Sequence, residues 1–239
     1  VMSRAMTGAP AVPHTGLTED EREFAGTMRA FADEVVAPRS YEADRTHTLP
    51  LDVVAQMGEL GLFGLPFAED IGGQGGDYAA FCLALEALGR VDQSIAITLE
   101  AGVGLGAAPI VHFGTEAQQT EYLPDLLAGR ALAGFGLTEP DAGSDAGATR
   151  TTARLEGGEW VIDGAKQFIT NSGTAITRFV TVTAVTGSRD GRDGQPRPEI
   201  STIIVPNGTP GFEVAPAYDK VGWNASDTVS YTHLRAHET

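Results

Sequence analysis

Two short segments of this 239-residue chain combine residue types that could hold a polar ligand. The first runs from Phe135 to Asp145 as F-G-L-T-E-P-D-A-G-S-D, with Thr138 and Ser144 placing hydroxyls at its two ends. Its small residues permit close backbone approach, so the loop could direct amides and hydroxyls at an anion such as a pyrophosphate. An ordinary turn capped by Asp and Ser uses the same residues, and on residue types alone it is the commoner outcome.

The second segment runs from Gly164 to Gly173 as G-A-K-Q-F-I-T-N-S-G. Phe168 and Thr170 are two residues apart, so on a strand they would share one face. An aromatic ring and a hydroxyl on one face could flank a planar heteroaromatic ring. The alternative is an ordinary strand with Phe168 in the core.

Charge and hydropathy exclude several classes of partner. The chain has 32 Asp plus Glu against 16 Lys plus Arg, for a net charge of -16. This balance excludes broad electrostatic affinity for nucleic acid or anionic lipid, although a local loop could still hold an anionic small molecule. No apolar run approaches the roughly 18 residues of a membrane span. No secretory signal is visible, so we expect a cytoplasmic protein.

Cysteine and histidine usage gives no metal or disulfide pattern. The single cysteine, Cys82, excludes a disulfide framework within the chain, and its apolar neighbours predict a buried small side chain. His233 and His237 are four residues apart and could share a helical face, but no third ligand accompanies them. We therefore predict no metal site.

The first half of the chain carries helical patterns. Residues 1–16 are polar and are expected to be disordered. T-E-D-E at Thr18 to Glu21 is a capping box that begins a helix, which we expect to end at Pro38. A second capping box at Thr115 begins a short helix that we expect Pro124 to interrupt. Further helices are predicted over 50–60, 77–90 and 94–112, so residues 17–130 form an all-α domain.

The pattern changes to strands near residue 131. Asp163-Gly164 is a tight-turn signal between two strands, and 187–198 is predicted to be a polar loop. Residues 131–228 therefore predict an antiparallel β-barrel or sandwich, and the chain as a whole an α+β fold. The predicted strands cover 149–155, 159–163, 178–186, 200–205 and 211–215.

Taken together, the two segments resemble the flavin-binding middle domain of the acyl-CoA dehydrogenases. The evidence is T-E-P-D-A-G-S-D at 138–145 and I-D-G-A-K-Q-F-I-T-N at 162–171. L-G-L-F-G-L-P-F-A-E-D-I-G-G-Q-G-G at 60–76 and F-G-T-E-A-Q-Q at 113–119 resemble that family's N-terminal domain, and K-V-G-W-N-A-S-D-T at 220–228 continues the likeness. The resemblance implies FAD as cofactor, an acyl-CoA oxidised to trans-2-enoyl-CoA, electron-transfer flavoprotein as acceptor, and a homo-oligomer when full length.

The resemblance also assigns site residues by position. Thr138 would bond the pyrimidine side of the flavin, and Ser144 would meet both the FAD pyrophosphate and the acyl-CoA pantetheine. Phe168 stands where many relatives carry Trp, which removes an indole donor. The full set of implied cofactor contacts is Phe135, Leu137, Thr138, Gly143, Ser144, Phe168, Ile169 and Thr170.

The last residues, 229–239, do not align with the family. The resemblance implies that the chain is truncated before a C-terminal four-helix bundle, which carries the family's catalytic glutamate. We therefore assign no catalytic base and expect the chain to be inactive alone. The alternatives are an acyl-CoA oxidase or flavin monooxygenase of the same fold, or an inert fragment that binds FAD weakly or not at all. A yellow colour of the purified protein would distinguish the last of these.

Overall fold

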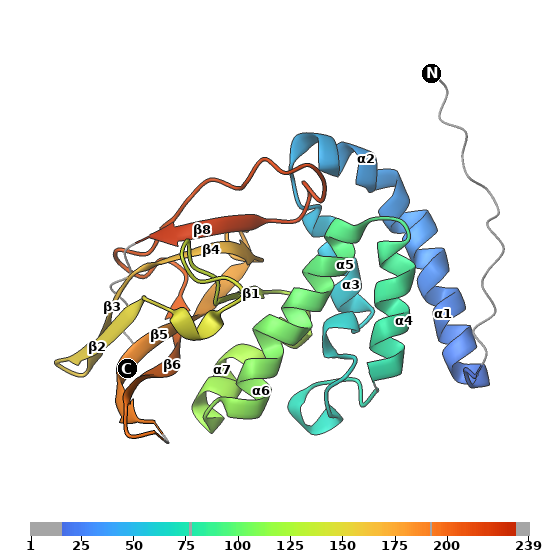
Figure 1. Ribbon diagram of the computed structural model, residues 1–239. Coiled ribbons are helices and arrows are strands. Elements are labelled where there is room, and N and C mark those ends of the chain that lie inside the picture. The colour runs from blue at the N-terminus through green and yellow to red at the C-terminus, as the bar shows by residue number, and fades with distance from the viewer. Residues whose placement is uncertain (1–15, 77, 192, 233–239) are drawn as a thin grey trace.

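The computed structural model describes residues 16–76, 78–191 and 193–232 (Figure 1). A helical half and a β half lie side by side, which confirms the predicted α+β fold and its order along the chain. Of residues 1–16, for which disorder is predicted, only Gly16 lies within these ranges. His233 and His237 lie outside the described residues.

The first helix, α1 (Glu19–Phe31), begins at the predicted capping box. The Thr18 hydroxyl accepts from the Glu21 amide at 3.2 Å, and the Glu21 carboxylate accepts from the Thr18 amide at 2.6 Å. The predicted end at Pro38 is wrong. A π-helical segment, η1 (Ala32–Val36), continues directly into α2 (Ala37–Thr46). Pro38 directly follows this wider segment, in which the Ala37 amide donates to the Ala32 carbonyl five residues back, so the helix accommodates the proline without ending.

The remaining helices follow the predicted pattern with one further difference. Pro124 lies inside α7 without interrupting it, so that prediction is wrong. Thr120, whose carbonyl would otherwise bond to residue 124, is exposed, so water can satisfy that carbonyl. The elements are α3 (Leu51–Glu59), η2 (Leu62–Gly64), η3 (Glu69–Ile71), α4 (Tyr78–Gly89), α5 (Gln93–Ala101), η4 (Gly102–Ala107), α6 (Ala108–Phe113) and α7 (Glu116–Leu127).

The expectation that no apolar run approaches the length of a membrane span is wrong for one helical run. Among the described residues, only Gln93–Phe113 is long and apolar enough to cross a membrane, and 56% of its most apolar window is buried inside the protein. Leu99 on this run is fully buried in the helical core. The run packs in the core of the helical half.

The helical core reaches into the β half. Met57, Phe63 and Leu99 are fully buried among the helices, and Leu132 and Phe179 join the same cluster from strands. Burial of apolar side chains is the main favourable contribution to folding, and this buried cluster includes side chains from both halves. The helical half therefore holds one face of the main sheet in place.

The β half contains two sheets. β5 (Thr177–Asp190) pairs in parallel with β1 (Leu132–Gly136) and at one position with β2 (Thr152–Glu156), which forms a hairpin with β3 (Glu159–Asp163). β6 (Pro196–Pro206) runs antiparallel to β5. The second sheet has the order β4 (Ala165–Thr170), β8 (Thr228–Thr232), β7 (Glu213–Val214). The expected sandwich is thus mixed rather than wholly antiparallel.

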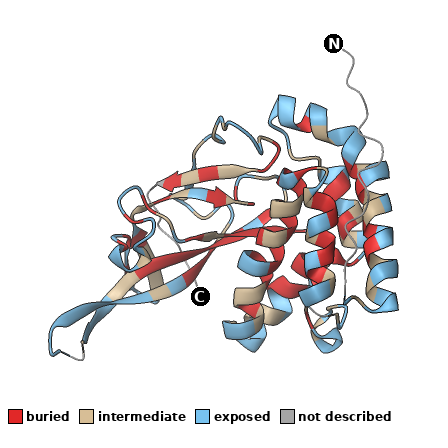
Figure 2. Ribbon diagram, turned by 45° about the vertical axis from the view of Figure 1, so that its right-hand side comes forward, coloured by how far each residue is buried: buried red, intermediate tan, exposed pale blue. Residues whose placement is uncertain are grey.

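Two local predictions in the β half and one in the helical half are wrong. Asp163-Gly164 does not close a hairpin, because β3 and β4 belong to different sheets; a Cβ on Gly164 would lie 2.3 Å from the Thr151 hydroxyl. Within the predicted loop at 187–198, residues 187–190 belong to β5 and residues 196–198 to β6, and the two strands pair in a ribbon that projects from the sheet (Figure 2). Cys82 is exposed rather than buried, since α4 turns it away from the core.

The expected break at residue 229 is also wrong for residues 229–232. Val229 and Tyr231 lie on β8 and are buried in the core between the two sheets. Their period-two alternation with Ser230 is the signal of a half-buried strand. Residues 233–239 of the expected tail lie outside the described residues.

Two helical glycines give a test of the packing. Gly58→Ala is expected to destabilise the protein, because the new Cβ would lie 2.2 Å from the Ala128 carbonyl oxygen. Gly26→Ala on the exposed side of α1 meets nothing within 4 Å and should stabilise it by about 0.5–1 kcal/mol, the usual gain in a helix. Urea unfolding of both variants checks this, and an equal gain in both would contradict the α3–α7 packing.

Candidate cofactor site

The two segments singled out in the sequence lie side by side in the structure. The loop that follows β1 contacts β4 through Gln167, whose amide donates to the Thr138 carbonyl at 2.9 Å. The Gln167 side chain donates to the Glu139 carbonyl at 3.3 Å. The loop and the strand therefore form one surface.

A tight turn shapes the loop. Glu139 and Ala142 exchange two backbone hydrogen bonds, of 3.0 and 3.2 Å. Gly143 and Ser144 follow at its exposed end, and a Cβ on Gly143 would meet nothing within 4 Å. Over the described ranges, the amides of Gly143 and Ser144 and the Ser144 hydroxyl have no hydrogen-bond partner. These donors are available to an anion.

A buried ion pair anchors the loop to β4. The Lys166 ammonium lies 2.7 Å from the Glu139 carboxylate, and both side chains are at most 4% exposed. Lys166 also donates to the Leu137 carbonyl at 3.2 Å and to the Thr183 hydroxyl at 2.9 Å. The pair thus joins the loop, β4 and β5 at one point.

The Glu139 carboxylate is saturated with donors. Besides Lys166 it accepts from the Thr149 hydroxyl at 3.0 Å and from the amides of Arg150 at 2.7 Å and Thr151 at 3.1 Å. Such a set of donors satisfies a charge that burial would otherwise make very costly.

These contacts determine how the pair titrates. Burial would raise the pKa of Glu139, but the hydrogen bonds from Lys166, Arg150 and Thr151 together lower this pKa to about 2. Burial lowers the pKa of Lys166, and its contact with Glu139 opposes that shift. Because the pKa of Glu139 falls on folding, its stabilising effect is complete above the ordinary value of about 4.3. That effect is lost as the pH falls toward about 2.

A bulge in β4 turns an aromatic ring outward. The pairing with β8 shifts between Lys166 and Ile169, and Phe168 has φ 61°, a left-handed conformation that is rare for a bulky residue. The residue is 57% exposed, and its ring contacts the ring of Tyr218 at a tilt of 40° with the ring centroids 5.1 Å apart. Phe168 is therefore not a core residue, and simple strand alternation does not describe this segment.

Long-range hydrogen bonds hold the far end of β4. The Asn171 side chain donates to the Thr98 carbonyl on α5 at 2.9 Å. The Asp227 carboxylate accepts from the amides of Ser172 at 2.8 Å and Gly173 at 2.6 Å. The strand is thus fixed to both the helical half and the loop before β8.

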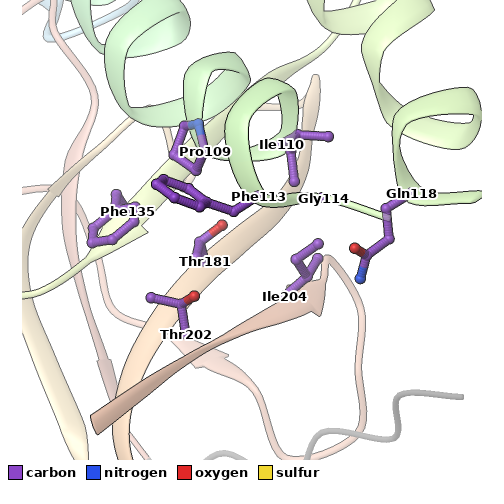
Figure 3. Close-up of a pocket in the computed structure, with 9 residues that line it drawn as sticks. All are labelled: Pro109, Ile110, Phe113, Gly114, Gln118, Phe135, Thr181, Thr202 and Ile204. Carbon is purple, nitrogen blue, oxygen red and sulfur yellow. The ribbon is translucent and has the colours of Figure 1, made fainter. Parts of the chain in front are cut away.

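The predicted site residues fall into two groups. Leu137 and Phe168 are exposed, and the half-buried hydroxyls of Thr138 and Thr170 make no hydrogen bond within the described part of the chain. With Gly143 and Ser144 they line the loop and β4. The other two side chains lie elsewhere: Ile169 is buried between the sheets, and Phe135 lines a cavity between α6 and the main sheet (Figure 3).

Comparison with known proteins identifies the family. The chain matches the acyl-CoA dehydrogenase N-terminal domain over residues 18–130 and the acyl-CoA dehydrogenase middle domain over residues 134–235. The chain belongs to the acyl-CoA dehydrogenase family. The middle-domain match includes part of the segment that the sequence analysis left unaligned.

Individual relatives agree with this assignment. The probable acyl-CoA dehydrogenase YngJ of Bacillus subtilis (strain 168) is 44% identical over 213 residues, which cover 89% of this chain and 54% of the relative. The structure of butyryl-CoA dehydrogenase from Megasphaera elsdenii is 35% identical with a TM-score of 0.82, covering 92% of this chain and 57% of that one. Glutaryl-CoA dehydrogenase from Mycobacterium smegmatis in complex with FADH2 is 33% identical with a TM-score of 0.83, covering 92% and 54%. The chain spans about half the length of the curated relatives it matches.

Sequence reasoning missed the groups that hold the site together. Lys166 is one of only two lysines in a chain with fourteen arginines, which was the one available signal. Nothing in the local sequence pairs it with Glu139, 27 residues away, or pairs Asp227 with Ser172, 55 residues away. Over the described ranges, no three His, Cys, Asp or Glu side chains gather into a group that could hold a metal ion.

The ion pair can be tested against an exposed pair on the same loop. Glu139→Gln is expected to reduce the free energy of unfolding by about 3–5 kcal/mol, because it leaves the Lys166 ammonium buried without its counter-charge. Asp141→Asn removes an ion pair with Arg150 of similar length, 2.7 Å, whose partners are exposed, and should cost less than about 1 kcal/mol. Urea unfolding at pH 7 compares the two; equal losses would show that the buried pair is not the anchor.

Proposed function

We propose that this chain is the flavin-binding part of an acyl-CoA dehydrogenase and holds FAD on the surface formed by the 137–145 loop and β4. The observation that carries the proposal is a set of unpartnered hydroxyls, those of Thr138, Ser144 and Thr170, beside the exposed ring of Phe168. Exposed apolar rings and convergent polar groups are the usual lining of cofactor sites.

Each part of the surface suits a different part of FAD. The outward ring of Phe168 and the side chain of Leu137 offer apolar contact to a flat ring. The hydroxyls of Thr138 and Thr170 can donate to the polar edge of that ring. The free amides of Gly143 and Ser144, with the Ser144 hydroxyl, can bind the pyrophosphate, and Ser144 can also contact the pantetheine of an acyl-CoA.

Backbone donors can hold an anion here despite the overall charge of -16. Asp141, two residues before Gly143, is paired with Arg150 at 2.7 Å, whereas Asp145, directly after Ser144, is exposed and forms no ion pair within the described ranges. Lys166 is committed to Glu139 and is at most 1% exposed, so it holds the loop rather than touching the ligand. Backbone amides therefore do the anion binding.

When bound, FAD accepts a hydride as an acyl-CoA is oxidised to trans-2-enoyl-CoA. The reaction also needs a base for the α-proton, and Glu139 cannot serve because its donors keep its pKa at about 2. Among the described carboxylates, Glu100 is the first to test as an alternative base. Burial raises its pKa, and Thr98 on the same helix accepts a hydrogen bond from Asn171 at the end of β4. We propose that this chain alone lacks the base.

The partners follow from the same proposal. An acyl-CoA is the substrate, electron-transfer flavoprotein takes the electrons, and the complete protein is a cytoplasmic homo-oligomer. The names of the relatives support the substrate class, since those compared above are acyl-CoA, butyryl-CoA and glutaryl-CoA dehydrogenases.

FAD titration tests the cofactor site. Ser144→Ala is expected to weaken FAD binding by about 1.5–3 kcal/mol, roughly tenfold or more, because a hydrogen bond to a charged group is lost. Thr138→Ala should weaken it by a smaller factor. Ser188→Ala, an exposed serine on the β5–β6 ribbon, is the matched control and should change nothing. If both site variants bind FAD as the unmodified chain does, the site is wrong.

Anaerobic addition of acyl-CoA tests the missing base. FAD-loaded protein mixed with short, medium and long acyl-CoAs should keep its flavin absorbance. Bleaching at an enzymatic rate would show that a base lies within these residues, and its loss in Glu100→Gln would identify that base.

A further inference from the structure

A second cavity lies apart from the loop and β4. It has a volume of about 390 Å³ and opens between the α6–α7 connection and the helix-facing side of the main sheet (Figure 3). Its walls are mostly carbon, and none of its lining residues is charged. They include Phe113, Gln118, Phe135, Thr181, Thr202 and Ile204.

Strand register explains how the floor of this cavity forms. Phe135 on β1, Thr181 on β5 and Ile204 on β6 are direct neighbours across the sheet, so they share one face. On the same face, Phe179 is covered by Tyr122 of α7 and belongs to the helical core. The cavity lies where that helical cover ends.

One buried polar group in the cavity has no partner. Thr181 is 4% exposed, and its hydroxyl oxygen makes no hydrogen bond with any described residue. Figure 3 shows this oxygen directed into the cavity, toward the ring of Phe113. Buried hydroxyls are almost always hydrogen-bonded, so an unpartnered one facing a cavity indicates a place for a ligand atom. The other two polar side chains of the cavity are less buried: Thr202 is exposed and Gln118 is half-buried.

We propose that this cavity binds an uncharged amphiphile, a molecule with a short apolar body and one hydroxyl or carbonyl that bonds to Thr181. The apolar walls suit the body of such a molecule, and Thr181 supplies the buried polar contact. A carboxylate or phosphate is excluded because no cation lines the cavity and the chain carries a charge of -16. The site is independent of the proposed FAD surface.

Titration of the isotope-labelled chain with 1-octanol tests the site. Amide NMR signals of Phe135, Thr181 and Ile204 should shift and saturate, whereas octanoate at pH 7 should bind at least about tenfold more weakly for want of a cation. Saturating FAD should leave the octanol affinity unchanged. Equal binding of octanoate, no saturable shift with octanol, or competition by FAD would each overturn the proposal.

Two variants and one control locate the contact. Thr181→Val keeps the shape of the side chain and should weaken octanol binding about three- to tenfold through loss of one hydrogen bond. Thr202→Met, at an exposed position, should block the opening without disturbing the core. Tyr231→Phe removes another buried hydroxyl without a partner, between the two sheets, and should leave octanol binding unchanged. Unchanged affinity in both cavity variants would contradict the assignment.

Discussion

The main constraint on this site is a buried ion pair, in which a lysine ammonium and a glutamate carboxylate are both removed from water. Charges at Lys166 and Glu139 are tolerable at such burial only if every donor and acceptor is satisfied. Their partners come from the loop after β1, from residues 149–151 and from β5. The ion pair therefore determines where the loop lies relative to β4.

The proposed FAD surface depends on that arrangement. Thr138 follows Leu137, whose carbonyl accepts from Lys166, and Phe168 is two residues beyond Lys166 on β4. Glu139 carries the tight turn that presents Gly143 and Ser144. One buried ion pair thus positions both the atoms that would touch the flavin ring and those that would touch the pyrophosphate. The pair itself stays out of contact with FAD.

The sequence predicts what depends on neighbouring residues. The capping boxes at Thr18 and Thr115 form as expected, because each needs only residues three positions apart. Predictions failed where distant contacts or solvent override a local rule. Pro38 and Pro124 are accommodated in helices, and residues 187–190 and 196–198 of the polar run pair as an exposed ribbon.

The candidate site divides in the same way. The loop and β4 were recognisable by their motifs, but the bulge at Phe168 and the anchors Asp227 and Asn171 depend on partners from β8, the 215–227 loop and α5. No rule based on residue spacing in a single sequence predicts contacts between residues so far apart in the chain. The resemblance supplied residue roles, and the structure supplies the reason those residues are held in place.

The most direct test of the flavin surface is an NMR map of FAD binding to the labelled chain. The account predicts that the largest amide shifts fall on Thr138, Gly143, Ser144, Phe168 and Thr170, while Thr181 in the second cavity is unaffected. Shifts concentrated elsewhere, or no saturable shift at all, would contradict the claim that the loop and β4 form the cofactor site.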